Sequence, residues 1–353
     1  MSWARDIGNR AMRRSLLALM LAAGVVAGPC AEAADLLPVR VGVTRGIDSG
    51  PLYIAAANVY FRDEGLDAQL KFFDTETALA AAVAAGQVDI GAAGLNASFF
   101  AAAARHDFKF LASQISDQAG YPTDALLIGK KAYESGFHGV KDLPHRRIAM
   151  TAAGAGEQYS MARIVARYRL DPHDVTLVWL KTPGREIAAL SRGEVDAIAL
   201  PFVTVLKLRA AGKGGGILRI SDLAQRQQGV IFVRAQTITA NRPLVEKFVR
   251  AYRRGVVEYD MTFQQRGDEG DVLPGPHFDE YLALIARQAG VAPDLLKYAL
   301  PYCDHLGRLD LTDIERQLAF WQSEGMVDKR IAAADLLDLS FIADHIRLPP
   351  EAN

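Results

Sequence analysis

Short strands and helices alternate along the chain, beginning near residue 37. Residues 39–43 alternate apolar and polar side chains as a strand does, and residues 51–63 follow with a helical pattern that Gly65 ends. The same half continues with a strand at 66–73, an Ala-rich helix at 75–85 and a short strand at 90–92. Helices that alternate with strands in this way predict an α/β fold with a largely parallel sheet.

The same order of elements recurs later in the chain, which indicates an internal repeat. The second half has strands at 147–150, 175–180 and 197–200, with helices at 157–168 and 185–192 between them. A G-x-V-D sequence precedes the third strand of each half, and Gly193 follows Gly86 by 107 residues, as Asp196 follows Asp89. Glycine favours the left-handed conformation that ends a helix, and we expect each aspartate to hydrogen-bond within the turn. Two such halves predict two similar α/β lobes.

Two further strand-like segments, at 124–129 and 229–234, lead from one half to the other as the crossing strands of a hinge. We therefore predict a discontinuous lobe one at residues 34–123 and 235–353, with lobe two and the hinge strands at 124–234. Helical patterns dominate the C-terminal region, at 242–263, 278–288, 293–300 and 312–324. These helices are expected to pack on lobe one.

The first 33 residues have the pattern of a secretory signal peptide. Arg10, Arg13 and Arg14 precede an apolar run at 16–26, and A-E-A at 31–33 provides a cleavage site with small residues. The run is shorter than the about 20 residues that a membrane-spanning helix needs. We therefore expect export to the periplasm, by either the general secretory or the twin-arginine route.

The composition restricts the classes of function. Half of the 353 residues are hydrophobic and 23% are charged, which is typical of a globular chain. With 40 basic and 41 acidic side chains, the chain lacks the basic excess of a nucleic-acid-binding protein. Loss of the signal peptide would remove Cys30 and leave Cys303 as the single thiol, so no cysteine-rich metal site is expected. The sequence also lacks H-E-x-x-H and G-x-S-x-G motifs, and we expect no enzyme, cofactor or metal.

Several dispersed motifs resemble the periplasmic solute-binding proteins of ABC importers. VKDL at residues 140–143 is similar to the segment that opens lobe two in this family, and DPHDV at 171–175 resembles its D-P-x-D-V turn. Both G-x-V-D sequences fit as well, whereas P-H-R at 144–146 departs from the usual Gly-Lys. The set is most similar to the group that binds sulfonates, nitrate, taurine and pyrimidine precursors of thiamine, and the resemblance spans residues 39–321.

This resemblance implies a two-lobed, type II-like fold with two hinge-crossing strands and a helical C-terminal region. It also implies that a monomer captures a small organic solute, anionic or heteroaromatic, in the cleft between the lobes. The partners would be the permease and ATPase of an importer in the inner membrane.

In open α/β sheets, ligands bind outside the carboxyl ends of the strands, which selects four loops here. In lobe one the candidates are Ser49, Gly50, Pro51, Leu52, Asn96 and Ala97. In lobe two they are Gly154, Ala155, Gly156, Glu157, Gln158, Tyr159, Pro201 and Phe202. These loops lead into helices, whose free N–H groups suit an anion. Ser49, Asn96 and Gln158 offer hydrogen bonds. Tyr159 and Phe202 could enclose an aromatic body, although Phe202 equally suits a core.

Structural roles compete with ligand binding at these positions. Ser49 and Asn96 could act only as helix caps. Gly154 and Gly156 could simply form a tight turn. Glu157 either complements the helix dipole or holds an amine or amidine of the ligand. The ligand therefore stays open among sulfonates, aromatic carboxylates and pyrimidines.

Two alternative functions remain beside solute import. One is a periplasmic sensor that is not coupled to transport. The other is an enzyme related to the pyrimidine-precursor synthases that share the fold. Those synthases act inside the cell and carry a cysteine-rich motif, so the signal peptide and the single remaining cysteine argue against this alternative.

Overall fold

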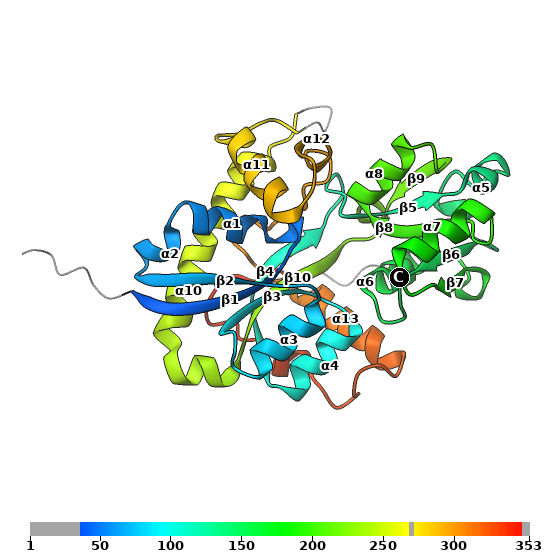
Figure 1. The fold of residues 1–353 in the computed structure, drawn as a ribbon. Coiled ribbons are helices and arrows are strands. Elements are labelled where there is room, and N and C mark those ends of the chain that lie inside the picture. The colour runs from blue at the N-terminus through cyan, green and yellow to red at the C-terminus, as the bar shows by residue number, and fades with distance from the viewer. Residues whose placement is uncertain (1–35, 268–271, 348–353) are drawn as a thin grey trace, which may run out of the picture. The chain divides into compact units, whose positions relative to one another are not determined.

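The computed structural model describes residues 36–267 and 272–347, which form two five-stranded sheets with their helices (Figure 1). The predicted signal peptide at 1–33 lies outside the described residues, as does Cys30. The first sheet contains β1 (Leu37–Thr44), β2 (Leu66–Phe73), β3 (Ile90–Gly94), β4 (Phe108–Asp117) and β10 (Arg226–Arg234). The second contains β5 (Asp124–Ile128), β6 (Arg147–Met150), β7 (Thr176–Trp179), β8 (Ala197–Pro201) and β9 (Gly216–Arg219). The predicted α/β class is confirmed.

The two sheets have the same topology. Their strand orders are β2-β1-β3-β10-β4 and β7-β6-β8-β5-β9. In each sheet the strand in the fourth place runs antiparallel to both neighbours, and the pairs on the other side are parallel. Each antiparallel strand is one of the two segments that cross between the halves. We refer to each sheet with its helices as lobe one and lobe two.

The pairing of β10 corrects one boundary of the prediction. Residues 229–234 were predicted as a hinge-crossing strand and grouped with lobe two, but β10 fills the gap between β3 and β4 in the first sheet. β4 itself was not predicted, because buried polar residues interrupt its apolar pattern at Ser113, Gln114 and Asp117. The other lobe boundaries stay a prediction.

The strand register confirms the internal repeat. Val41 pairs with Ile90 in the first sheet, and Ile148 pairs with Ala197 in the second, so both partners are displaced by 107 residues. The glycine of each G-x-V-D sequence is left-handed as predicted.

The two aspartates of these sequences have the same structural role. The Asp89 carboxylate accepts a hydrogen bond from the Arg40 backbone N–H at 2.9 Å, and Asp196 accepts one from the Arg147 N–H at 2.8 Å. Each aspartate thus ties its turn to a neighbouring strand of its own sheet, Asp89 to β1 and Asp196 to β6. Hydrogen bonds within the turn were predicted from the sequence. Instead, the observed bonds reach the neighbouring strand.

The helices cover both faces of the sheets. They are α1 (Gly50–Ala57), α2 (Tyr60–Asp63), α3 (Glu76–Ala84), α4 (Ala97–Arg105), α5 (Lys130–Glu134), α6 (Gly156–Arg167), α7 (Pro183–Arg192), α8 (Phe202–Ala210), α9 (Ile220–Leu223), α10 (Ala235–Phe263), α11 (Phe278–Ala289), α12 (Pro293–Leu296) and α13 (Leu311–Ser323). In the first sheet, α1, α10 and α11 share one apolar core, whereas α3, α4 and α13 share the core on the opposite face (Figure 1). No helix in the described ranges combines the length and apolar character needed to cross a membrane.

One predicted helix is divided in the structure, and another is preceded by an additional helical segment. The helix expected at 51–63 is divided into α1 and α2, because Val59 adopts a left-handed conformation with φ of 54°. The helix expected at 242–263 is confirmed as the second part of α10, and Asn241 separates it from the first part, which begins at Ala235, by non-helical backbone angles. The Asn241 side chain then accepts a hydrogen bond from the Leu244 N–H at 3.2 Å, as a helix cap does.

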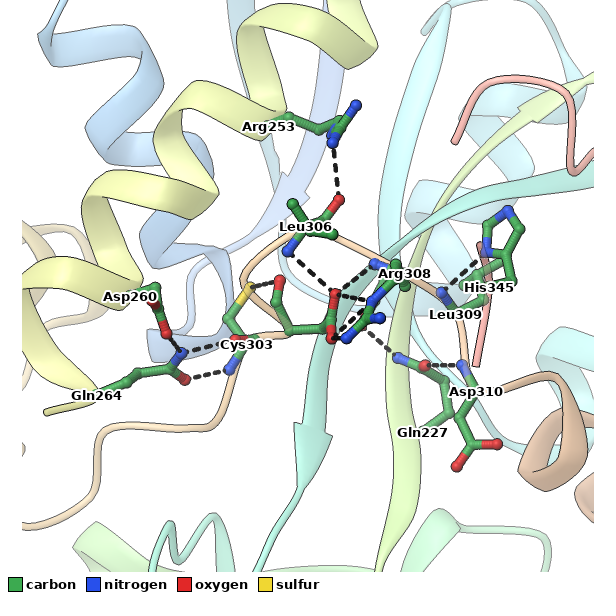
Figure 2. Close-up of polar contacts among 12 residues, drawn as sticks. Gln227, Arg253, Asp260, Gln264, Cys303, Leu306, Arg308, Leu309, Asp310 and His345 are labelled. Atoms are coloured by element: carbon green, nitrogen blue, oxygen red, sulfur yellow. Dashed lines mark hydrogen bonds and ion pairs between the residues drawn. The ribbon is translucent and has the colours of Figure 1, made fainter. Parts of the chain in front are cut away.

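A network of polar contacts holds the C-terminal region together and attaches it to lobe one (Figure 2). The Gln264 side chain exchanges two hydrogen bonds with the backbone of Cys303, of 2.6 and 2.7 Å. The Arg308 guanidinium donates to the Asp304 carboxylate at 2.8 Å. The Gln227 side chain, on β10, accepts from the Asp310 N–H at 3.0 Å. The predicted packing of this region on lobe one is confirmed.

We expect Asp89→Ala and Asp196→Ala each to lower the free energy of unfolding by about 1–2 kcal/mol, because each leaves a strand N–H without its charged acceptor. Urea unfolding of the purified protein measures this change. Asp74→Ala is the control, since Asp74 is exposed. Equal stabilities of the Asp89 and Asp74 variants would contradict this role.

Candidate functional site

A cavity of about 460 Å³ lies between the two sheets. Its walls come from the loop after β1, the ends of β3 and β4, the starts of β5 and β10, and the first turns of α8. The loop between α11 and α12 closes part of the wall at Val291. The volume lies in the range of small-molecule sites, and the position agrees with the rule for open α/β sheets.

A buried arginine joins the three strands that meet at this cavity. The Arg226 side chain, on β10, is 4% exposed and donates to the Asp117 carboxylate of β4 at 2.7 Å. Its guanidinium also donates to the Asp124 carboxylate of β5 at 3.4 Å. Although burial disfavours its charge, the neighbouring carboxylates raise the pKa of Arg226 above its usual value. The ion pairs therefore link β5, the crossing strand of the second sheet, to β10 and β4 of the first.

Gly156 gives this arginine its space. A Cβ atom on Gly156 would lie 2.0 Å from an Arg226 guanidinium nitrogen. Gly156 is the first residue of α6, so lobe two packs directly over the ion pairs. This close approach of α6 to Arg226 requires glycine at position 156.

A β-bulge directs one side chain toward the cavity. Gln227 pairs with Ser116 of β4 and Gly229 pairs with Ile115, which leaves Gln228 without a partner on that strand. The Gln228 side chain lines the cavity, and its amide nitrogen donates to Asp124 at 3.3 Å. Bulges commonly re-aim side chains in this way beside binding sites.

Three carboxyl groups line the cavity, on Asp48, Glu76 and Asp124. Burial raises the pKa of Asp48 to about 6. Burial, together with the nearby Asp48 and Glu157, raises the pKa of Glu76 to about 7. Burial and the Glu157 and Asp117 charges raise the pKa of Asp124 well above its usual value, which Arg226 only partly opposes. The site therefore carries closely spaced acids in a poorly solvated wall.

The predicted residues of the first loop lie beside the cavity, in the core. Ser49 is fully buried, and its hydroxyl accepts from the Gln114 amide nitrogen at 3.3 Å. Gly50, Pro51 and Leu52 are buried in α1. Asn96 caps α4 by accepting from the Phe99 N–H at 2.9 Å, which is the structural role weighed from the sequence.

The loop at residues 151–159 joins the two lobes away from the cavity wall. The Ala97 N–H donates to the Gly154 carbonyl at 3.0 Å. Gln158 donates to the Glu324 carboxylate at 3.1 Å, and the Tyr159 hydroxyl donates to Asp313 at 2.6 Å. Burial raises the pKa of Asp313 to about 6.

Among the fourteen predicted residues, Pro201 lines this cavity. Phe202 is buried in a core of lobe two, and Ala155 precedes α6 as its N-terminal cap residue. Glu157 is half-buried and acts on the cavity through its charge. Ligand contact by all fourteen predicted residues, Pro201 included, stays a prediction.

The polar cavity residues that the sequence reasoning missed include Asp48, Glu76, Gln114, Asp124 and Gln228. Asp48 lies within a loop that had been selected, so its acidic side chain was a usable signal. Gln114 lies on the unpredicted strand β4. Asp124 was assigned only to a hinge strand, and Gln228 lies just before the other. The bulge that exposes Gln228 has no sequence signal of its own.

Two sheets of equal topology, exchanged antiparallel strands and a cavity between strand ends define a two-lobed periplasmic binding protein fold. Residues 47–261, more than half of the chain, match the family described as NMT1/THI5 like. The chain belongs to this family. No curated protein shows a significant sequence match to it.

Solved structures of similar fold include two sulfonate-binding proteins. The alkanesulfonate-binding protein SsuA from Xanthomonas axonopodis pv. citri, bound to MOPS, has 20% identity and a TM-score of 0.62, over 87% of this chain and 100% of that one. The periplasmic aliphatic sulphonate binding protein SsuA from Escherichia coli has 17% identity and a TM-score of 0.65, over 85% and 97%. The desulfurization enzyme DSZB has 14% identity and a TM-score of 0.57, over 86% and 97%. Likeness at these identities establishes the fold.

Asp48→Asn is expected to raise the melting temperature of the ligand-free protein by about 2–4 °C at pH 7.5. Because its folded-state pKa is raised, Asp48 binds a proton more tightly in the folded than in the unfolded protein, so its contribution to stability falls as pH rises from about 4 to about 6. Below pH 4 the gain from the variant should therefore vanish. Thermal unfolding at both pH values measures this, and a gain independent of pH would contradict it.

Arg226→Met should lower the free energy of unfolding by about 3 kcal/mol or more, since it leaves Asp117 and Asp124 buried without their cation. Arg219→Met is the matched control, because Arg219 pairs with Asp222 at an exposed site and should change stability by about 1 kcal/mol or less. Urea unfolding distinguishes the two. Similar losses would show that the buried ion pairs have no special role.

Proposed function

We propose that this chain is the extracytoplasmic solute-binding component of an ABC importer, and that it captures a small organic solute in the cavity between its lobes. The observation that supports this most is the composition of the cavity wall. Loops of both sheets and both crossing segments contribute to the wall. One solute would therefore contact both lobes and both crossing segments. A ligand that contacts both lobes favours a closed state through its extra affinity for that state.

The family and the structural neighbours support a binding role. Two of the neighbours are described as sulfonate-binding proteins, one of them periplasmic. For this chain we propose a periplasmic location and action as a monomer, without cofactor or nucleic acid. The closed form would deliver its solute to a permease and its ATPase in the inner membrane.

The single described cysteine is unsuited to catalysis. Cys303 is fully buried, and its thiol donates to the Gln114 carbonyl at 3.3 Å. Burial and the nearby Asp304 raise the pKa of Cys303, which disfavours the thiolate that a nucleophile requires. We therefore propose binding without chemistry. The fold shared with DSZB makes an enzyme the alternative to test.

A thermal-shift screen of small organic solutes should yield compounds that raise the melting temperature of the purified protein, because a ligand that binds the native state stabilises it. Thr204→Trp should abolish the shift, since Thr204 lines the cavity on α8. Ala210→Trp, at the exposed end of the same helix, is the matched control and should retain it.

The recovered solute separates the two functions. Mass spectrometry after prolonged incubation should return it unchanged, and conversion would favour the enzyme. Loss of uptake of that solute in cells lacking the chain tests the coupling to transport, and unchanged uptake would favour a sensor.

A further inference from the structure

We infer that the cavity selects a small organic cation whose N–H groups donate to the Asp48 and Asp124 carboxylates and to the side-chain carbonyls of Gln114 and Gln228. A protonated amine or an amidinium group has this chemistry. The inference rests on the proposed function and specifies the ligand class of the same site.

The first argument is that two buried acceptors in the cavity wall lack donors. Gln114 is 1% exposed, and its amide nitrogen donates to both Asp48 and Ser49 at 3.3 Å. These bonds fix the orientation of the amide and leave Oε1 buried, with no partner among the described residues. A buried acceptor without a donor is costly, and a ligand N–H would satisfy it.

The same arrangement recurs at the bulge. The amide nitrogen of Gln228 is committed to Asp124, and its Oε1 is likewise buried without a partner in the described ranges. Gln114 and Gln228 lie on adjacent strands, β4 and β10, and both line the cavity. Two adjacent strands of the wall therefore each carry a buried side-chain carbonyl that lacks a donor among the described residues.

The charges of the wall favour the same class of ligand. Asp48, Glu76 and Asp124 line the cavity, and Glu157 lies near enough to act on two of them. The buried cation nearby, Arg226, is already paired with Asp117 and Asp124. A ligand cation would reduce the repulsion among these acids, whereas a sulfonate would add another negative charge.

Two cations of the wall are exposed, which weakens their influence on the interior. Arg45 stacks over the Phe72 ring, with its guanidinium carbon 4.3 Å from the centroid. Lys207 lies exposed on α8. Water and salt screen such exposed charges more than buried ones.

Isothermal titration calorimetry with isosteric probes tests this inference on the purified full chain. Benzamidine is compared with benzenesulfonate, and butylamine with butane-1-sulfonate, at pH 7.5. We expect each cation to bind at least about tenfold more tightly than its sulfonate partner, a difference that calorimetry resolves readily. Tighter binding of either sulfonate would overturn the inference.

Paired variants locate the binding. Asp48→Asn should weaken benzamidine binding about tenfold, whereas Lys207→Gln should strengthen it about twofold by removing a like charge. Gln228→Leu, which removes an acceptor and leaves the carboxylates, should weaken it several-fold. Asp67→Asn at an exposed site is the control, and thermal unfolding establishes that each variant is folded. Unchanged affinity in both the Asp48 and Gln228 variants would contradict the inference.

The outcomes separate this inference from the proposed function. Sulfonate binding that Thr204→Trp abolishes would retain the solute-binding function and reject the cation. A chain that binds neither member of either pair, nor any solute in the thermal-shift screen, would reject both.

Discussion

The buried ion pairs of Arg226 are the interaction on which the connection between the lobes depends. One guanidinium binds carboxylates on β4 and β5, although it lies on β10 itself. A buried charge is tolerable only when it is paired and hydrogen-bonded, so the ends of these three strands are held in one arrangement. Because the same strand ends form the cavity wall, the charge that organises the crossing also positions the site.

The cavity combines features that oppose stability in the absence of a solute. Its acids are poorly solvated, as their raised pKa values indicate, and two glutamine carbonyls are buried without donors. A fully satisfied wall would be more stable but would offer nothing to a ligand. The bulge places Gln228 at the cavity, and Gly156 leaves room for Arg226 beside Asp124.

The repeat and the fold class could be predicted because they depend on local patterns. Helix-ending glycines, the G-x-V-D turns and alternating apolar residues recur at a fixed offset, and the register follows that offset. The residues of the candidate site were harder to predict from the sequence. The rule of strand ends pointed to loops beside the cavity, but Gln114 lies on a strand whose buried polar residues conceal it, and Gln228 faces the cavity only through a bulge. The sequence also could not show that Gln158 and Tyr159 bond to Glu324 and Asp313.

The two antiparallel strands, β10 in the first sheet and β5 in the second, also set an order in which the sheets can form during synthesis. All five strands of the second sheet lie within one continuous stretch, from Asp124 to Arg219. The first sheet, by contrast, cannot join β3 to β4 until β10 has been made, more than a hundred residues after β4 ends. The N-terminal lobe therefore remains open along two strand edges while the inserted lobe already has every strand it needs.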